Sequence, residues 1–363
     1  MLILGLLLSI DAQAQEPLQL ELSRRVPVTS AESMAMGSAG MALAIGANGV
    51  FFNPASPAIR KDHQGPSDLT GVLSLSSALV LARLDDQRLT ERWVENRLDV
   101  GLAGRYKRIG VGLVFTTLQD SGPNGQLVST EGHLTGGLQL NTGALGIGLR
   151  TVSASVQRPG RPDLNYVGVG WQVGYLLTSL GEGVNVGFSF RSRVIAPAME
   201  SSFDAPDVAV APWELGFGLS RVFIASWAKS LPMRLAADIV LEGPVHDAGA
   251  IESLYVSGNV WVQQGGSLTF SPRMGMEVEV VEDRLRLRTG TWHEASRLQQ
   301  LAGTWHGTAG LELKLLPLPV GPWERDLAVE FAVDRGSGFT NVNWLSLGFW
   351  EGGQVEGGVR EHP

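Results

Sequence analysis

The sequence predicts an all-β protein, namely a transmembrane antiparallel β-barrel with an N-terminal hatch segment inside its lumen. Most of the chain from about residue 69 to residue 350 alternates apolar residues with small or polar ones, which is the two-residue period of β-strands. The alternating segments run for about 9 to 15 residues, as tilted transmembrane strands require, whereas strands of soluble sheets usually have about 5 to 6. In addition, 46 of the 363 residues are Gly, without a Gly-X-Y repeat, so the fold must need small residues repeatedly.

Residues 1–14 have the pattern of a secretory signal peptide. A short apolar run precedes Ala12-Gln13-Ala14, and this small-x-small pattern predicts cleavage after Ala14, although no basic residue precedes the run. A buried N-terminal strand is the alternative interpretation. No later window of about 18 apolar residues suggests a membrane helix, so a chain that crosses a bilayer would have to close a β-barrel.

Residues 15–66 are predicted to form the hatch, a compact plug that precedes the barrel strands. Gly and Ala are concentrated between residues 32 and 58, and this run ends in Phe51-Phe52-Asn53-Pro54-Ala55. Small residues let backbones pack closely, and Asn-Pro ends a helical turn because the residue before Pro prefers extended geometry. These are the features that a plug inside a narrow lumen needs.

Residues 67–350 are predicted to form the barrel, and residues 351–363 form a polar, Gly-rich tail. Outer-membrane barrels have an even number of antiparallel strands, so we predict fourteen and expect that one of the alternating segments is misassigned or belongs to the plug. These segments are residues 69–81, 98–106, 109–117, 133–141, 144–155, 166–180, 183–196, 212–227, 231–243, 250–264, 272–281, 283–293, 301–315, 326–335 and 340–350.

The segments between the strands predict one short helix and three long loops. Residues 85–97 lose the two-residue period and carry Leu89, Trp93 and Val94 at helical spacing, which predicts a short helix in a loop. Long extracellular loops are expected where Pro, Gly and Asp gather, and the short links between strands are expected to be periplasmic turns. The three predicted loops are residues 119–130, 158–165 and 196–212.

One hairpin carries a candidate network of charges in the lumen. A two-residue turn at Glu282-Asp283 would pair Val280 with Leu285 and Val278 with Leu287 on one face, and Glu279 with Arg286 and Glu277 with Arg288 on the other. A charge on the lipid face costs about 2–4 kcal/mol at mid-bilayer, so Glu277, Glu279, Arg286 and Arg288 should point into the lumen. There they would brace the wall or meet a carboxylate head group. The solvated face of a soluble sheet would produce the same pattern.

Composition and motifs exclude several classes of protein. A net charge of -8 argues against nucleic-acid binding, and the absence of Cys excludes a disulfide scaffold and thiol catalysis. A hydrophobic fraction of 44% excludes a disordered chain. The sequence contains no Gly-x-Ser-x-Gly elbow, no His-Glu-x-x-His motif and no dinucleotide-binding glycine pattern. We therefore predict no enzyme, no cofactor and no metal site.

Two stretches resemble the FadL-like family of outer-membrane transporters for long-chain fatty acids and other hydrophobic compounds. The hatch of that family is a Gly-Ala-rich run that ends in Asn-Pro-Ala, and here Gly37, Gly40, Gly46, Asn53, Pro54 and Ala55 match it. Residues 272–277 and 285–290 resemble a late hairpin of the family, with an Arg-x-Gly-x-Glu strand and a Leu-x-Leu-Arg-x-Gly strand. The chain departs from the family in its polar tail after Phe349-Trp350 and in its short length.

The resemblance implies a fourteen-stranded barrel in the bacterial outer membrane, closed by the hatch and embedded in lipid. It further implies passive uptake of a hydrophobic small molecule, and the residues that it suggests for hatch gating are Gly46, Phe51, Phe52, Asn53, Pro54 and Ala55. Related PorV-type barrels bind protein partners instead, so a scaffold or shuttle for secreted or surface proteins is the alternative. A soluble all-β protein, whose apolar faces would meet in a core, is a third hypothesis.

Overall fold

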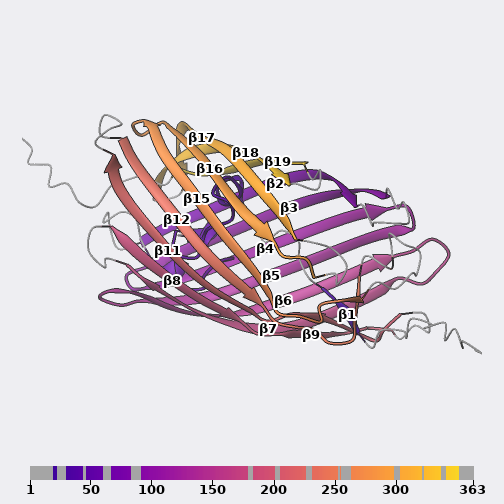
Figure 1. Ribbon diagram of the computed structural model, residues 1–363. Coiled ribbons are helices and arrows are strands. Elements are labelled where there is room, and N and C mark those ends of the chain that lie inside the picture. The colour runs from indigo at the N-terminus through magenta and orange to yellow at the C-terminus, as the bar shows by residue number, and fades with distance from the viewer. Residues whose placement is uncertain are drawn as a thin grey trace, which may run out of the picture.

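The wall of the molecule is a closed antiparallel barrel of fourteen strands (Figure 1). The computed structural model describes residues 19–22, 30–43, 46–59, 67–82, 91–178, 183–200, 205–225, 231–251, 254, 263–297, 303–320, 323–336 and 341–350. The barrel strands are β2 (Ser67–Ala82), β3 (Glu91–Tyr106), β4 (Ile109–Gly122), β5 (Gly125–Gln139), β6 (Gly143–Gln157), β7 (Leu164–Leu177), β8 (Val184–Arg191), β11 (Glu214–Ala225), β12 (Leu231–Glu242), β15 (Thr269–Val281), β16 (Leu285–Glu294), β17 (Thr304–Val320), β18 (Trp323–Gly336) and β19 (Asn341–Phe349). The ring closes because β19 pairs with β2, and β8 pairs with β11.

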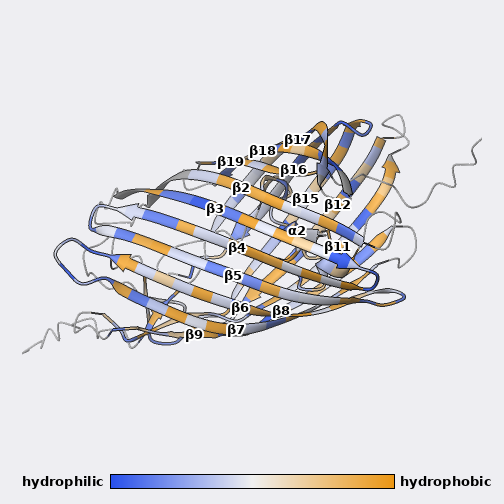
Figure 2. Cartoon of the chain, turned by 180° about the vertical axis from the view of Figure 1, so that it is seen from behind, coloured by the Kyte–Doolittle hydropathy of each residue, from blue (hydrophilic) through white to orange (hydrophobic). Residues whose placement is uncertain are grey.

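Along the strands, apolar residues face outward and small or polar residues face the lumen. In β4, for example, Ile109, Val111 and Leu113 are 61%, 53% and 42% exposed, while the residues between them are buried. Figure 2 shows this alternation as bands of apolar and polar colour along the strands. Charged side chains such as Glu131, Asp238 and Arg288 are buried inside the ring. A barrel that is apolar outside and charged inside is built for lipid, which contradicts the soluble all-β hypothesis.

The two ends of the barrel differ in their connections. At one end short turns join β3 to β4, β5 to β6 and β15 to β16. The first barrel strand, β2, begins at this end, and the last, β19, ends there. The opposite end holds the longer connections, including residues 192–213 and 243–268. Short turns lie at the periplasmic end of outer-membrane barrels, so we name the two ends periplasmic and extracellular on this basis. No helix in the described part of the chain is long and apolar enough to span a bilayer.

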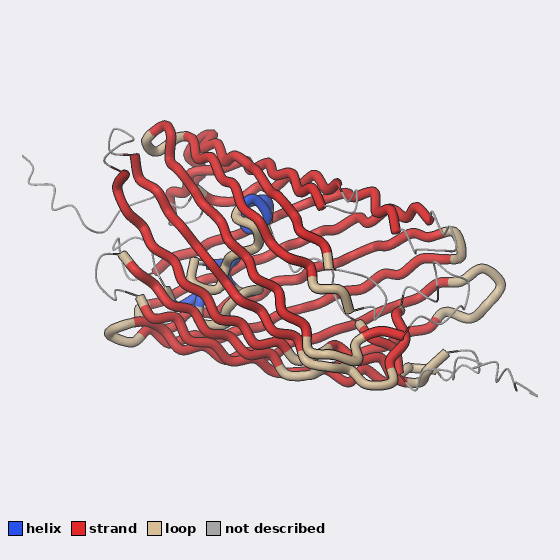
Figure 3. The backbone as a smooth tube through the Cα atoms, viewed as in Figure 1, coloured by secondary structure: helices blue, strands red, loops and turns tan. Residues whose placement is uncertain are grey.

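Short helical elements fill the lumen. They are α1 (Ala31–Ala35), α2 (Gly46–Gly49) and the 3-10 helix η1 (Ser56–Ala58), and they lie within the ring of strands (Figure 3). The Ser30 hydroxyl begins α1 by accepting a hydrogen bond from the Ser33 amide at 3.2 Å, as N-cap residues do. We refer to the described residues 30–43 and 46–59 as the hatch.

A second, five-stranded sheet sits at the extracellular end. Its strands, in spatial order, are β14 (Gln263–Gln264), β13 (Ala248–Ala250), β1 (Gln19–Glu21), β10 (Val208–Ala211) and β9 (Val194–Pro197). β9 follows β8 and stays beside β7, where Tyr166 and Ala198 form an antiparallel bridge. The small sheet therefore branches from the wall and carries β1 into its middle, as Figure 1 shows near the labels β1 and β9.

Several connections differ from the predictions. The helix predicted over residues 85–97 is wrong for residues 91–97, which belong to β3; residues 85–90 lie outside the described part of the chain. The long loop predicted over residues 119–130 is also wrong, because β4 and β5 continue as a ladder to a tight turn that follows Gly122. These strand ends project beyond the apolar belt, where water solvates both faces and the alternation in the sequence fades.

The loop predicted over residues 196–212 contains the end of β9 and the whole of β10. In the remaining predicted loop, residues 158–163 form no strand, and β7 begins at Leu164. The segment predicted at residues 250–264 was the surplus one. Its described residues lie in or beside β13 and β14 of the small sheet and not in the wall. This is why the sequence shows one more alternating segment than the barrel has strands.

Candidate functional site

Glycines on the inner face of the wall make room for the hatch. A methyl group at Gly146 would overlap the Pro54–Ala55 backbone, and one at Gly174 would overlap the Asn53 side chain. A methyl group would also overlap hatch atoms at nine other wall glycines: Gly110, Gly112, Gly137, Gly187, Gly216, Gly218, Gly275, Gly290 and Gly310. The unusual glycine content thus includes a set of wall positions at which the hatch approaches the strand backbone directly.

Asn53 ties the hatch to two wall strands. Its fully buried side-chain amide donates to the carbonyl oxygens of Tyr175 in β7, at 3.1 Å, and Phe188 in β8, at 3.0 Å. Its side-chain oxygen accepts the Ala55 amide at 3.0 Å and so orders the turn through Pro54. One side chain thereby sets the local turn and attaches it to the wall.

The remaining sequence-predicted hatch residues lie in the same region. Phe51 and Phe52 are buried, and Phe51 meets the His133 ring of β5 edge to face at 4.9 Å. Gly46 begins α2 with a φ of 65°, a left-handed conformation that other residues adopt at a cost. The next amide, that of Ala47, donates to the Thr70 hydroxyl of β2 at 2.9 Å. The structure therefore brings Gly46, Phe51, Phe52, Asn53, Pro54 and Ala55 together as one packed body against the wall.

Sequence reasoning missed a second attachment, at Asp238 of β12. A single carboxylate oxygen of this buried side chain accepts hydrogen bonds from the amides of Gly40, at 2.6 Å, and Met41, at 2.8 Å. The signal in the sequence is an isolated charge within an apolar strand, which marks a lumen-facing position. The identity of its partner depends on the path of the hatch, which no sequence pattern reveals.

Helix α1 is attached to the opposite side of the wall by polar side chains. The Ala31 amide donates to the Ser346 hydroxyl at 2.8 Å, and the Glu32 amide donates to a Glu330 carboxylate oxygen at 3.1 Å. At its other end the Ala35 carbonyl accepts the Thr308 hydroxyl at 3.1 Å. Separate hydrogen bonds therefore hold the hatch, and each adds about 0.5–1.5 kcal/mol between neutral groups and about 1.5–3 kcal/mol where the acceptor is a carboxylate.

The predicted charge network exists, and it is larger than the sequence suggested. Arg288 Nε lies 2.7 Å from Glu277 Oε2, and Arg286 Nε lies 3.2 Å from Glu279 Oε2, with all four side chains buried in the lumen. Glu312 of β17 joins both arginines, which the sequence did not indicate. Glu32 of the hatch reaches Arg288 at 3.4 Å, so the network connects the wall to α1.

One detail of this hairpin differs from the predicted register. Glu277, Val278 and Glu279 face their predicted partners, but Leu285 pairs with Val281 and not with Val280. The ladder shifts between Glu279 and Val281, and the turn spans residues 282–284. Asp283 takes a positive φ of 55° there, so the connection is one residue longer than a two-residue turn and a bulge absorbs the difference.

A polar pocket lies where the hatch meets this part of the wall. Arg286 and Glu312 of the charge network line it, together with residues of α1, α2, β2, β18 and β19. The lining residues are Glu32, Ala47, Asn48, Thr70, Gly71, Arg286, Glu312, Glu330, Gly348 and Phe349. The Asn48 amide donates to Glu32 Oε2 at 2.9 Å across this space. The pocket is therefore a small hydrophilic space between hatch and wall, and not an apolar one.

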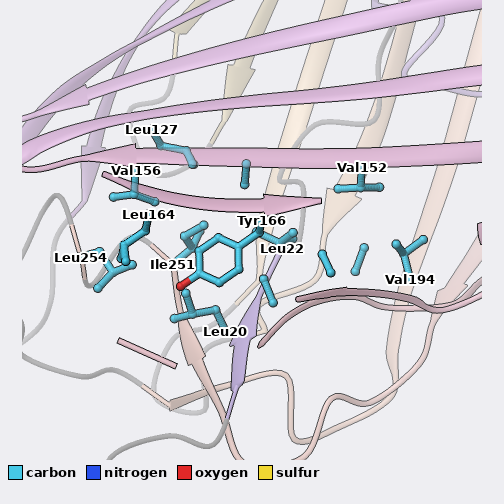
Figure 4. Close-up of a cluster of buried hydrophobic side chains, with 14 of the residues drawn as sticks. Leu20, Leu22, Leu127, Val152, Val156, Leu164, Tyr166, Val194, Ile251 and Leu254 are labelled. Atoms are coloured by element: carbon cyan, nitrogen blue, oxygen red, sulfur yellow. The ribbon is translucent and has the colours of Figure 1, made fainter. Parts of the chain in front are cut away.

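On the extracellular side of the hatch the lumen becomes apolar. The inward faces of β5, β6 and β7 contribute Leu127, Val152, Val156, Leu164 and Tyr166, which Figure 4 shows as sticks. Leu20, Leu22, Ile251 and Leu254 of the chain itself fill the space between them. We call this region the apolar compartment. The sequence does not indicate which residues form this compartment, because the short segments that fill it carry no periodic signal.

One buried histidine, His306, lies between two carboxylates. His306 Nδ1 lies 3.0 Å from Asp334 Oδ2, its Nε2 lies 3.3 Å from Glu294 Oε2, and its ring stacks on Trp292. Both ring nitrogens of His306 therefore contact carboxylates of the protein itself, which favours a structural role for this side chain. Within the described residues no group of three His, Asp or Glu is arranged to hold a metal ion.

Comparisons with solved structures find barrels with the same arrangement. A FadL homologue of Pseudomonas aeruginosa superposes with a TM-score of 0.63 over 90% of this chain and 99% of that one, at 11% identity. The chain has the FadL fold. The toluene transporters TodX of Pseudomonas putida and TbuX of Ralstonia pickettii both give TM-scores of 0.54 at 12% identity, and cover 93% and 89% of this chain and 99% and 97% of their own. A scan against family models and a search of curated proteins found no match.

The FadL fold and the apolar outer face together place the chain in the bacterial outer membrane. Closed antiparallel barrels with an outward apolar belt and a polar interior are the strand-based structures of that membrane. The late hairpin and the Asn-Pro-Ala segment both lie where the hatch contacts the wall. Asn53 bonds to β8, and Arg288 of the hairpin bonds to Glu32 of the hatch.

Proposed function

We propose that the protein is a passive channel for uncharged hydrophobic small molecules and that the hatch gates it. The observation that carries this proposal is the hatch itself, which fills the periplasmic half of the lumen and is attached to the wall by separate hydrogen bonds at Asn53, Asp238 and Ser346. Breaking a few such bonds is a modest change. The FadL fold supports the assignment, since solved structures with this fold include proteins described as toluene transporters.

The charge network favours an uncharged ligand. Around the polar pocket the carboxylates of Glu32, Glu277, Glu279, Glu312 and Glu330 outnumber the guanidinium groups of Arg234, Arg286 and Arg288. These arginines already contact carboxylates of the protein. A carboxylate ligand would meet net negative charge, so we propose that Glu277, Glu279, Arg286 and Arg288 brace the wall and do not bind a head group.

Uptake by cells tests this proposal. Cells that produce the protein should take up radiolabelled toluene faster than cells with an empty vector, and should show a smaller gain for a fatty-acid anion. The double variant Asn53→Ala/Pro54→Ala should change the rate while the barrel keeps its heat-modifiable migration on gels. Equal toluene uptake with and without the protein would refute the channel function. Unchanged uptake by the double variant would refute the gating role of the hatch.

The scaffold alternative has no observation in its favour among the described residues. A partner-binding barrel has no need for an apolar compartment next to a hatch that is attached by hydrogen bonds. The proposal therefore keeps a hydrophobic small molecule and membrane lipid as the partners of the chain.

A further inference from the structure

Residues 37–41 of the hatch, which we call the hatch loop, are held by two neighbouring strands of the wall, β12 and β15 (Figure 1). The Asp238 carboxylate of β12 accepts hydrogen bonds from the Gly40 and Met41 amides, at 2.6 Å and 2.8 Å. The Arg273 guanidinium of β15 donates from Nη1 to the Ser38 carbonyl oxygen at 3.4 Å. One acidic and one basic side chain of the wall thus bind backbone groups of the same loop.

Asp238 and Arg273 lie directly opposite one another in the wall, yet they do not pair. They are cross-strand partners in the ladder of β12 and β15, and they are only 3% and 6% exposed. Opposite charges at such positions ordinarily attract each other. Among the described residues no ion pair joins these two, and Asp238 Oδ1 and Arg273 Nε have no hydrogen-bond partner. Both charges are therefore buried with the hatch loop, and not each other, as their polar contact.

A glycine makes room for Asp238 on the side away from Arg273. Gly218 of β11 lies opposite Asp238 across the other edge of β12, and a methyl group there would overlap Asp238 Oδ1. The carboxylate therefore lies toward β11, whereas Arg273 belongs to β15. The Cβ atoms of cross-strand neighbours are about 4.5–5.5 Å apart, so a change of rotamer can bring the two charged groups together.

Asp238 is also the acidic residue that Arg273 can bind without competing with another arginine. Glu242 and Glu277, the next acidic residues of β12 and β15, already contact arginines at 3.2 Å and 2.7 Å. A buried carboxylate and a buried guanidinium offset part of their desolvation cost when they pair, most of all in a bidentate geometry. The separation of Asp238 from Arg273 is therefore sustained by their bonds to the hatch loop.

The hatch loop itself has a strained backbone. Gly37 has a φ of 60°, and the next residue, Ser38, has a φ of 59° although it carries a Cβ atom. A left-handed conformation costs residues other than Gly conformational energy, so it persists where surrounding contacts impose it. Release of the loop from the wall allows Ser38 to return to an ordinary conformation, which favours release.

We propose that Asp238 and Arg273 form a latch that works by exchange of partners. In the closed channel both side chains hold the hatch loop, and when the loop leaves the wall they bind each other. The inference rests on the proposed function, because it states how the hatch is released. An ion pair that forms only in the open state offsets the loss of the hydrogen bonds to the loop, so opening costs less than the loss of these bonds alone.

The variant Arg273→Met tests the latch, because a latch and a plain attachment predict opposite signs. Met removes the open-state partner of Asp238 but leaves the bonds from Asp238 to Gly40 and Met41. Hydrogen exchange of these two amides, measured by mass spectrometry on the full-length protein in detergent, reports release of the loop. The latch predicts exchange about tenfold slower than in the wild type, as the loss of a charge-assisted contact from the open state requires. A rate equal to or faster than that of the wild type would overturn the proposal.

Two further variants separate charge from packing. Arg273→Lys keeps a cation that can reach Asp238, and should restore most of the wild-type exchange rate. Asp238→Asn removes the carboxylate, so adding Arg273→Met to it should no longer slow exchange. Slowing of the same size in the wild-type and Asp238→Asn backgrounds, or no recovery in Arg273→Lys, would overturn the proposal.

A plain attachment supplies the matched control. Ser346→Ala removes the hydroxyl that accepts the Ala31 amide, a neutral contact without an ion pair to replace it. Exchange of the Ala31 amide should therefore speed up in this variant. Slower exchange here as well would refute release of the hatch as the source of the signal, and the latch with it.

The exchange experiment needs no ligand, so the latch and the channel can fail separately. Slower exchange in Arg273→Met, with no toluene uptake by any variant, would refute the channel and keep the latch. Toluene uptake that depends on the protein, together with unslowed exchange in Arg273→Met, would refute the latch and keep the channel. Where both hold, Arg273→Met should lower toluene uptake several-fold.

Discussion

The side-chain amide of Asn53 donates to the backbone carbonyl oxygen of Phe188 at 3.0 Å, which joins the hatch directly to the barrel wall. The same amide reaches the Tyr175 carbonyl on the neighbouring strand. Two wall carbonyls thus converge on one donor group. A side chain that offers only acceptor oxygens at this position would face both carbonyls without a donor.

Asn53→Asp should therefore loosen the hatch while the barrel stays closed. The substitution keeps the shape of the side chain but loses the donor and buries a charge, which costs at least about 1–3 kcal/mol. Amide hydrogen exchange of residues 46–59, measured by mass spectrometry, should speed up by about tenfold or more, since about 1.4 kcal/mol corresponds to a factor of ten. Asn165→Asp, at an exposed position of β7, is the matched control. Identical exchange in Asn53→Asp and wild type would contradict the role of Asn53 as an attachment.

Gly146→Ala should displace the hatch, whereas Gly136→Ala should not. The two glycines lie on adjacent strands, but a methyl group at Gly146 meets the Pro54–Ala55 backbone, while one at Gly136 meets nothing within 4 Å. Backbone atoms cannot move aside as a flexible side chain can, so a methyl group at position 146 costs about 1–3 kcal/mol, as overpacking does. Exchange of the 46–59 amides should rise in Gly146→Ala alone. A similar rise in both variants would mean that the wall, and not the hatch contact, responds to the added methyl group.

The strands of the barrel wall can be predicted from the sequence more completely than the contacts inside the lumen. The alternation of residues such as Ile109, Val111 and Leu113 follows from strand geometry and lipid contact, so it can be read from a single segment. The Glu277–Arg288 and Glu279–Arg286 pairs were also predictable, because complementary residues at matching positions specify the register. The polar ends of β4 and β5 could not be predicted, because they have no continuous apolar face to mark them as strands.

The lumen depends on contacts between segments that are remote in the chain. The motif at Asn53 marked the hatch, but its partners are backbone carbonyls of β7 and β8, and a carbonyl has no sequence signature. Asp238 is a similar case, because its partner is the backbone amide of Gly40, which also has no sequence signature. β1 spans only three residues, too few for any period, so its place in the small sheet could not be predicted.

Acid should weaken a contact at the periplasmic turn. The pKa of Asp283 lies below its usual value, because the Lys314 ammonium donates a hydrogen bond to its carboxylate; Trp350 Nε1 also donates to it, at 3.0 Å. A lowered pKa in the folded state means that the contact stabilises the protein above about pH 4 and is lost as the pH falls through the folded-state pKa. The contact is exposed, so its effect on global stability should be small.

Trp350 reports this titration. An acid titration of the wild type below about pH 4 should show a change in tryptophan emission that is missing in Asp283→Asn, whose amide does not titrate in this range. Asp326→Asn, on the other side of Lys314, serves as the control, because it removes a lysine partner without removing the contact to Trp350. The same acid-dependent change in Asp283→Asn as in the wild type would refute the assignment.

Arg288→Met should destabilise the barrel more than any exposed substitution nearby. Arg288 is buried against Glu277, Glu312 and Glu32, so its loss removes one cation from a buried cluster in which carboxylates already outnumber arginines. Breaking a buried ion pair from one side costs about 3–5 kcal/mol, which should lower the urea midpoint of unfolding. Arg284→Met, in the exposed turn of the same hairpin, should leave the midpoint almost unchanged. Adding Glu312→Gln to Arg288→Met should restore part of the loss, because it removes one carboxylate from the excess of negative charge; Glu312 then no longer accepts a charged contact from Arg286. If the double variant is as unstable as both single losses combined, Arg288 acts through packing and not through charge.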